Sequence, residues 1–315
     1  MRKFIAAVFA VAVAASAALA QSQQAPTLRI VSEDGNRLPS ELMYGNTKVK
    51  PLRLRPGTNV PITIDDSDFF VQQHYVDFLS RFPDPSGFAF WQNDINACGP
   101  NPQCVELHRV NVSAAFFLSI EFQETGGFVY RAYKAAFGNL PNRPVPVRRE
   151  NFMPDARSIS NGIIVGPEGW QAALSNNKTA YAQSFVQRAE FQNAYPASMT
   201  AAQFVDTLFS NGGVTPTAGE RSAAITAFGA GDTAGRAAAL RSVVESKTLQ
   251  DAEFNKAFVL MQYFGYLKRN PDDLPDMDFK GYSFWLTKLN EAGGNYANAE
   301  MVKAFISSTE YRTRF

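Results

Sequence analysis

RFPDPSGFAFW, residues 81 to 91, returns near the C-terminus in a longer form, RNPDDLPDMDFKGYSFW, residues 269 to 285. Both copies contain an arginine, a Pro-Asp pair, a glycine, an aromatic residue and a tryptophan, in that order. A pattern of this kind could be a catalytic loop, an acidic metal site or a structural turn. The spacing of the surrounding apolar residues favours the structural turn.

Apolar residues before and inside each copy are spaced as on one face of a helix. Val71, Tyr75 and Phe78 precede the first copy at i, i+4 and i+7. The tryptophan segments Phe88–Ile95 and Tyr282–Leu289 carry apolar residues at i, i+3 and i+7. Each copy therefore predicts a turn between two helices, which recurs because the structural unit recurs.

The residue types of the turn suit this role. Asp84 can accept hydrogen bonds from the free N–H groups of the tryptophan helix, and Gly87 permits tight backbone turning. Arg81 ends the preceding helix, where a cation suits the negative end of the helix dipole and can pair with Asp84. Trp91, Trp170 and Trp285 could form a platform on which sugars stack, but their positions on apolar helix faces favour packing in the core. The corresponding residues of the second copy, which contains an insertion before its glycine, are Arg269, Asp272, Gly281 and Trp285.

Two shorter elements also recur in a fixed order. Phe-Val, followed four residues later by an aromatic residue, occurs four times, and each occurrence precedes a Glu-aromatic pair at Glu121, Glu190, Glu253 or Glu310. The sequence therefore predicts an all-α fold, an array of about four small helix-turn-helix-helix units. The expected units are residues 66–125, 126–195, 196–253 and 254–315, the third being degenerate.

The segments YVDFLSRFPDPSGFAFWQNDI and YFGYLKRNPDD, with the later FFLSIEF and FISSTEY, resemble the bacterial family called domain of unknown function 4214. That pattern is also similar to the helical linker domains of phycobilisomes. The resemblance spans residues 66–315 and is strongest in the first and fourth units. It implies a small all-helical module of exported and surface proteins, often beside adhesin-like or calcium-binding repeats. It implies no established catalytic activity.

The N-terminal residues predict export. Residues 1–20 combine a cationic start, a short apolar run and the ending Ala-Leu-Ala, which together are typical of a signal peptide cleaved before Gln21. No later stretch is apolar enough to span a membrane, so we expect a periplasmic, cell-surface or extracellular protein. Residues 21–65 include TLRIV, KVKPLRLRPG and VPITI, which predict short strands in a β-rich N-terminal arm.

Charge and cysteine content restrict the partners. The formal charge of +1 becomes −1 once the two cations of the signal peptide are removed, so the chain lacks the basic excess of a nucleic-acid-binding protein. Cys98 and Cys104, in ACGPNPQC, are predicted to form a disulfide bond. Their spacing differs from C-x-x-C, and no second pair of cysteines completes a zinc site.

The acidic cluster of the second copy offers candidate calcium ligands. An EF-hand loop numbered from Asp276 fails, because Lys280 takes the fifth position and Thr287 the twelfth. Two interpretations of the cluster stay open, a less regular calcium site and a solvated loop. The candidate ligands are Asp272, Asp273, Asp276 and Asp278.

Residues suited to enzyme chemistry are few. The two histidines, His74 and His108, could form a metal or acid–base pair if the fold brought them together, but packing or surface roles are favoured. The motifs G-x-S-x-G, H-E-x-x-H and G-x-x-x-x-G-K-[ST] do not occur. We therefore predict no catalytic residues, and no cofactor apart from the calcium ion left open above.

These observations favour a non-catalytic interaction or structural module of the bacterial cell envelope or secreted fraction. It would bind an unknown protein or glycan through its helical surfaces. The alternative is a calcium-stabilised adhesin or surface-layer component, in which the metal would order the acidic turns. A hydrolase of unknown type is the third hypothesis.

Overall fold

The computed structural model describes residues 28–31, 41–44, 47–49 and 53–315. The predicted signal peptide at residues 1–20 lies outside these ranges. Within them, no helix combines the length and the apolar character needed to cross a bilayer.

Three short strands precede the helices. They are β1 (Leu28–Val31), β2 (Glu41–Tyr44) and β3 (Thr47–Val49), and they form an antiparallel sheet in the order β1-β2-β3. Antiparallel pairing between consecutive strands is typical of hairpin connections. Residues 53–64, where more strand was predicted, contain one isolated bridge, between Leu54 and Pro61. Proline has no N–H to donate to a continuous ladder, which limits pairing there.

From residue 67 onward the chain is helical, which confirms the predicted all-α fold class. The first helices are α1 (Ser67–Leu79), α2 (Pro85–Asn96), α3 (Pro102–Leu118), α4 (Ile120–Glu124) and α5 (Gly126–Phe137). The next are α6 (Arg149–Ser160), α7 (Trp170–Val186), α8 (Ala189–Ala194), α9 (Ala201–Gly212) and α10 (Ala218–Phe228). The last are α11 (Thr233–Val244), α12 (Lys247–Gln262), the π-helical turn η1 (Tyr263–Leu267), α13 (Lys280–Glu291), α14 (Met301–Ser307) and α15 (Thr309–Arg312).

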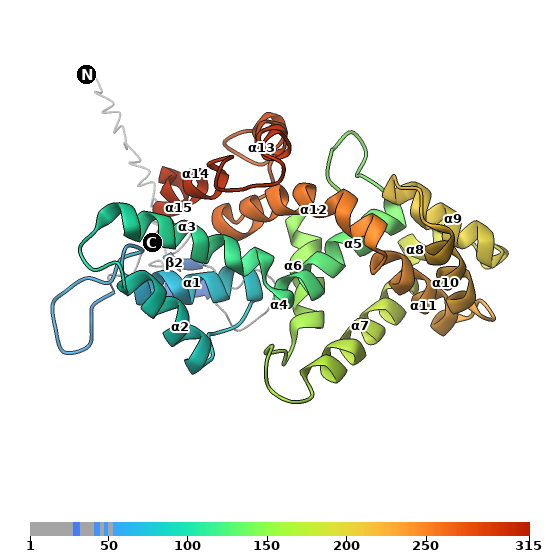
Figure 1. Ribbon diagram of the computed structural model, residues 1–315, viewed down its shortest axis with the longest axis horizontal. Coiled ribbons are helices and arrows are strands. Elements are labelled where there is room, and N and C mark those ends of the chain that lie inside the picture. Colours follow the sequence, from blue (N-terminus) through green and yellow to red (C-terminus); the bar gives the residue numbers. More distant parts are fainter. Residues whose placement is uncertain (1–27, 32–40, 45–46, 50–52) are drawn as a thin grey trace, which may run out of the picture.

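The helices form an elongated body with a continuous buried core (Figure 1). Helices α8–α11 gather at one end, and α1–α3 lie toward the other end with α14 and α15. Helix α12 lies between the two ends and packs against α5, while α11 packs against α7 and α5. The middle of the molecule is therefore built from helices that are far apart in the sequence.

Helix α12 runs through the unit boundary predicted between residues 253 and 254. Glu253 is buried and accepts a hydrogen bond from the Tyr130 hydroxyl at 2.9 Å. Leu249 and Phe258, on either side of it, are buried as well. Because the buried residues of this helix extend across residue 253, the chain stays helical where the sequence pattern predicted a change of unit.

The last residues of the chain pack against the first helix. Arg314 forms an ion pair with the buried Asp77 of α1 at 2.9 Å, and the rings of Phe69 and Phe315 meet edge to face at 5.5 Å. The C-terminus accordingly lies beside α1 in Figure 1. An open array would bring only neighbouring units into contact. This chain instead joins its first and last helices.

The predicted disulfide bond is confirmed. Cys98 and Cys104 are bonded, with Cα atoms 5.4 Å apart. Cys98 follows the end of α2 and Cys104 lies in the first turn of α3. The bond therefore closes the turn that joins these two helices.

Candidate binding site

The turn of the first copy is held by hydrogen bonds at both ends. Helix α1 ends at Ser80, which adopts the left-handed conformation and donates its backbone N–H to the carbonyl of Tyr75. Asp84 is the N-cap of α2, and its Oδ2 accepts the backbone N–H of Gly87 and the hydroxyl of Ser86, both at 2.8 Å. Pro85 occupies the first helical position, where its missing N–H removes no helical bond.

Arg81 connects this turn to α4, forty residues away. Its Nε and Nη2 donate to the two carboxylate oxygens of Glu121 at 2.7 and 2.8 Å, and Nη1 reaches Asp84 at 3.3 Å. A two-point pair between a guanidinium and a carboxylate fixes orientation as well as distance. We call the segment from Arg81 to Gly87, and its counterpart from Arg269 to Gly281, the arginine turn. Glu121 belongs to the recurring Glu-aromatic element, and its ion pair with Arg81 explains why that element accompanies the arginine turn. The sequence showed the recurrence but not the contact.

The second copy has the same arrangement, except that a different aspartate pairs with the arginine. Arg269 donates to both carboxylate oxygens of Glu310, at 2.6 and 3.1 Å. Its second acidic partner is Asp276, at 2.8 Å, whereas the sequence placed Asp272 in this role. The insertion carries Asp272 away from Arg269. Helix α13 begins after Phe279 without a side-chain cap.

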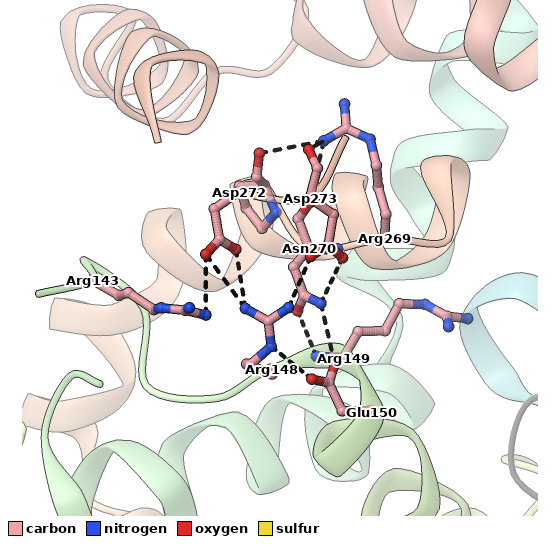
Figure 2. Close-up of polar contacts among 9 residues, drawn as sticks. Arg143, Arg148, Arg149, Glu150, Arg269, Asn270, Asp272 and Asp273 are labelled. Carbon is pink, nitrogen blue, oxygen red and sulfur yellow. Dashed lines mark hydrogen bonds and ion pairs between the residues drawn. The ribbon is translucent and has the colours of Figure 1, made fainter. Parts of the chain in front are cut away.

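Asp272 and Asp273 pair with arginines that precede α6 (Figure 2). Asp272 contacts Arg143 at 3.0 Å and Arg148 at 3.2 Å, and Arg148 also reaches Asp273 at 2.8 Å. Asn270 completes the cluster by accepting the backbone N–H of Arg149 at 2.7 Å. These contacts join the segment before α6 to the turn that follows η1.

The four candidate calcium ligands do not converge on one point. Asp276 pairs with Arg269, and Asp278 pairs with Lys280 at 2.9 Å. Within the described chain, the acidic, histidine and cysteine side chains close enough to share an ion do not include these four aspartates. Each of the four carboxylates is instead bound to an arginine or a lysine.

A cavity of about 300 Å³ opens beside the first turn. One wall is aromatic: Tyr75 meets Phe116 edge to face at 4.8 Å, and Trp91 lies 6.1 Å from Phe116. The guanidinium of Arg81 lies over the Tyr75 ring at 4.9 Å. The lining residues are Tyr75, Leu79, Arg81, Asp84, Ser86, Gly87, Trp91, Ala115, Phe116, Ser119, Ile120, Glu121 and Val165.

Tyr75 and Gly87 fit together within this cavity wall. A Cβ atom on Gly87 would lie 2.2 Å from the Tyr75 hydroxyl oxygen, so a larger residue cannot occupy the position without movement. Burial, with a further contribution from the charge of Asp84, raises the pKa of Tyr75 to about 12. The hydroxyl therefore stays protonated at neutral pH and can donate a hydrogen bond. The second copy repeats the contact, with a Cβ on Gly281 falling 2.6 Å from the hydroxyl of Tyr263.

All three tryptophans are partly buried and pack against the core. Trp91 and Trp285 contact the core phenylalanines Phe116 and Phe305 at 6.1 and 5.9 Å. Trp170 lines a separate cavity of about 310 Å³, near the buried Lys178. Each tryptophan thus has a packed face, and Trp91 and Trp170 also border a cavity.

The two histidines belong to different environments. His74 is buried, and its ring nitrogens lie 2.8 Å from the Phe70 carbonyl and 2.8 Å from the Ser113 hydroxyl. Burial lowers the pKa of His74 to about 4. His108 is partly exposed and bonds through Nδ1 to Asp94 at 2.8 Å. The two histidines therefore bind different partners and are not hydrogen-bonded to each other.

No family model, curated protein or solved structure matches the chain. The residues that line the cavity indicate which class of ligand would fit it. Aromatic faces, two carboxylates, an arginine and two serine hydroxyls surround a space of the size at which small-molecule sites begin. This combination suits a small polar ligand that has one apolar face.

Proposed function

We propose that this chain is a non-catalytic interaction module, exported to the bacterial cell envelope or secreted, that binds a saccharide unit of an envelope glycan. The observation that carries the proposal is the cavity between the Arg81 turn, α3 and α4. The predicted signal peptide, the disulfide bond and the resemblance to domain of unknown function 4214 support an exported module of this type.

The lining of the cavity suits a sugar ring on two grounds. A sugar ring has an apolar face that can lie against an aromatic side chain, and Trp91, which is only partly buried, supplies such a surface at the cavity. Its hydroxyl groups both donate and accept hydrogen bonds. The Tyr75 hydroxyl can donate to them, and Ser86 and Ser119, whose own O–H groups donate to Asp84 and to the Phe116 carbonyl, can accept from them. The side chains that fix orientation are held in place before the ligand arrives, which reduces the entropy lost on binding.

The polar groups at the cavity serve structural partners, which favours binding over catalysis. Glu121 accepts both bonds from Arg81, and Asp84 caps α2. A general base needs a carboxylate or imidazole within hydrogen-bond reach of the substrate proton, with a pKa near the working pH. Withdrawing either carboxylate from its partner would break the turn.

The test is an array of envelope glycans probed with the wild-type chain and with Ala115→Leu. Ala115 lines the cavity from α3, and a leucine there fills part of the space. We expect wild type to bind a defined set of glycans and Ala115→Leu to bind them at least about tenfold more weakly, equivalent to about 1.4 kcal/mol. Ala223→Leu, an exposed alanine of α10, is the matched control and should bind as wild type does.

The denaturation midpoint of Ala115→Leu must stay near that of wild type, so that lost binding is not lost folding. Equal binding by Ala115→Leu and wild type would show that the cavity is not the glycan-binding site. An array that stays blank with wild-type protein would exclude the saccharide.

A protein partner is the second candidate, because large apolar side chains are exposed around the same turn. Phe82 and Phe90 are 60% and 63% exposed, and Ile120 on the cavity rim is 58% exposed. Exposed aromatic residues of this kind commonly anchor protein interfaces. In pull-downs from envelope fractions, Phe82→Ser with Phe90→Ser would abolish capture of a protein partner. The same variant would leave saccharide binding in the cavity largely intact.

A further inference from the structure

A second site lies at the turn between α2 and α3, away from the Arg81 cavity. The sulfur atoms of Cys98 and Cys104 and a ring nitrogen of His108 lie within 4.8 Å of one another. All three residues are partly exposed, so solvent and ions can reach them. Two sulfurs and an imidazole nitrogen form a donor set that zinc accepts in proteins.

The backbone explains why these three side chains meet. Cys104 and His108 stand four residues apart on α3, so they occupy one face of the helix. Cys98 lies in the turn after α2, where Gly99 adopts a left-handed conformation, and its disulfide bond to Cys104 holds it at the same face. The Cα atoms of the two cysteines are 5.4 Å apart. Two thiolates on one tetrahedral ion lie about 3.8 Å apart, a separation that rotation of the side chains can provide.

Asp94 fixes the tautomer of the His108 imidazole. Its Oδ2 lies 2.8 Å from Nδ1 of His108. An ionised carboxylate only accepts hydrogen bonds, so the proton is on Nδ1 and the lone pair is on Nε2. A carboxylate behind a histidine in this way is the usual outer partner in zinc sites, where it fixes the tautomer and the ring orientation.

We propose that this turn is a redox-gated binding site for a thiophilic divalent cation such as zinc. When the disulfide bond is closed, neither sulfur is a thiolate and the ion is excluded. When a dithiol reductant opens the bond, Cys98, Cys104 and Nε2 of His108 bind the ion, and water takes the fourth position. The ion then links the same two positions that the disulfide bond links in the oxidised chain.

The chemistry balances in two steps. In the first, a dithiol transfers two electrons and two protons to the Cys98–Cys104 bond, giving two thiols while the reductant becomes a disulfide. In the second, the divalent cation displaces one proton from each thiol and accepts the lone pair of Nε2, releasing two protons to solvent. In the return step, a disulfide oxidant accepts two electrons from the two thiolates and two protons from solvent, becoming a dithiol, while the Cys98–Cys104 bond forms again and the ion is released.

The test is a cobalt titration of the full chain, oxidised or reduced with a phosphine under anaerobic conditions. We expect the reduced chain to bind one equivalent, with thiolate-to-cobalt charge transfer in the ultraviolet and the visible bands of a tetrahedral ion. Zinc should then displace the cobalt. The oxidised chain should show neither band. Zinc should also raise the melting temperature of the reduced chain and leave that of the oxidised chain unchanged.

Two variants separate this site from adventitious thiol binding, and both keep the cysteines. His108→Ala removes a ligand and should weaken cobalt binding at least about tenfold, with altered visible bands. Asp94→Asn removes the orienting carboxylate and should weaken binding roughly 10–100-fold. Glu106→Gln is the control: Glu106 also lies on α3 but pairs with Lys303, so this variant should bind as wild type does.

Reduced wild type that lacks the charge-transfer band would overturn the proposal. So would a His108→Ala variant, folded by circular dichroism, that binds cobalt as tightly as wild type. Neither result bears on the Arg81 cavity, because the two sites share no residue.

Discussion

His74 lies among the aromatic rings of the first helices and the C-terminal region. Its ring centroid is 4.2 Å from that of Phe70, 5.4 Å from that of Phe116 and 5.7 Å from that of Tyr266. Burial opposes a charge on the imidazole and lowers its pKa to about 4, more than the Phe70 carbonyl and the charge of Asp77 raise it. In the pH range between the ordinary pKa and the lowered one, His74 is therefore neutral in the folded chain and protonated in the unfolded chain.

This lowered pKa predicts that the chain becomes less stable as the pH falls. Between the ordinary pKa of 6.5 and about 4, the unfolded chain binds a proton that the folded chain does not. Stability is therefore full above about pH 6.5 and falls as the pH drops to about 4, by roughly 3 kcal/mol in all. Urea denaturation of wild type and His74→Gln across this range checks it: the variant should lose most of the slope.

The matched control is Gln73→Asn, which changes a partly exposed residue of the same helix that does not titrate and should keep the slope of wild type. A His74→Gln variant whose free energy of unfolding falls with pH as steeply as that of wild type would show that another group causes the pH dependence.

Each arginine turn packs its glycine against a tyrosine hydroxyl. The Gly87 and Tyr75 contact in the first copy matches the Gly281 and Tyr263 contact in the second. Both contacts join the helix before the turn to the start of the tryptophan helix. The glycine is needed at this position because of a side chain from the preceding helix, and not because its own backbone angles require it.

Gly87→Ala should therefore destabilise the chain, by about 2 kcal/mol, although alanine is the better helix former. Tyr75→Phe removes the hydroxyl, so Gly87→Ala should cost about 1 kcal/mol less in that background. Chemical denaturation of the two single variants and the double variant measures the difference. Gly219→Ala in α10, where the nearest heavy atom is 4.0 Å from the new Cβ, should be neutral or stabilising. If the two single variants lower the free energy of unfolding by amounts that add up to the loss in the double variant, the contact between Gly87 and the Tyr75 hydroxyl is contradicted.

The elements could be predicted from the sequence much better than their partners. Helical spacing located α1, α2 and α13, and Asp84 had the residue type of an N-cap. The Arg81–Glu121 pair could not be predicted, because forty residues separate its members and only the fold brings them together. In the second copy the insertion made Asp276, and not Asp272, the partner of Arg269. In a loop of that length, the sequence does not determine which aspartate meets the arginine, because tertiary contacts decide it.

The C-terminal residues close onto the first helix. Asp77 is buried on α1 and pairs with Arg314 at 2.9 Å and with Lys268 at 2.9 Å. Burial raises the pKa of this carboxyl, but the charges of Arg314 and Lys268 outweigh that effect and lower it to about 2. The pair therefore connects α1 with the turn after η1 and with the C-terminus.

The lowered pKa predicts that this closure fails in acid. Below the ordinary pKa near 4, the unfolded chain protonates Asp77 while the folded chain does not, so stability falls between about pH 4 and pH 2, by roughly 2.5 kcal/mol. Asp77→Asn should flatten this part of the curve and lower stability at pH 7 by about 3 kcal/mol, since two cations lose their buried partner. Urea denaturation from pH 7 to pH 2 measures both effects.

The control for that experiment is Asp206→Asn, which breaks an exposed pair with Arg221 and should change stability by less than about 1 kcal/mol. An Asp77→Asn variant as stable as this control at pH 7 would mean that the C-terminus does not depend on the ion pair.

The same arginine turn forms at two distant places in the chain, and an ion pair between an arginine and a glutamate holds each one. Double-mutant cycles by chemical denaturation would pair Arg81→Met with Glu121→Gln, and Arg269→Met with Glu310→Gln. Because three of these four side chains are less than one-fifth exposed, we expect a coupling of at least about 1 kcal/mol in both copies. The exposed Lys247 and Asp251 pair should give no more than about 0.5 kcal/mol. A coupling within error of zero in either copy would contradict the claim that the motif is a structural turn.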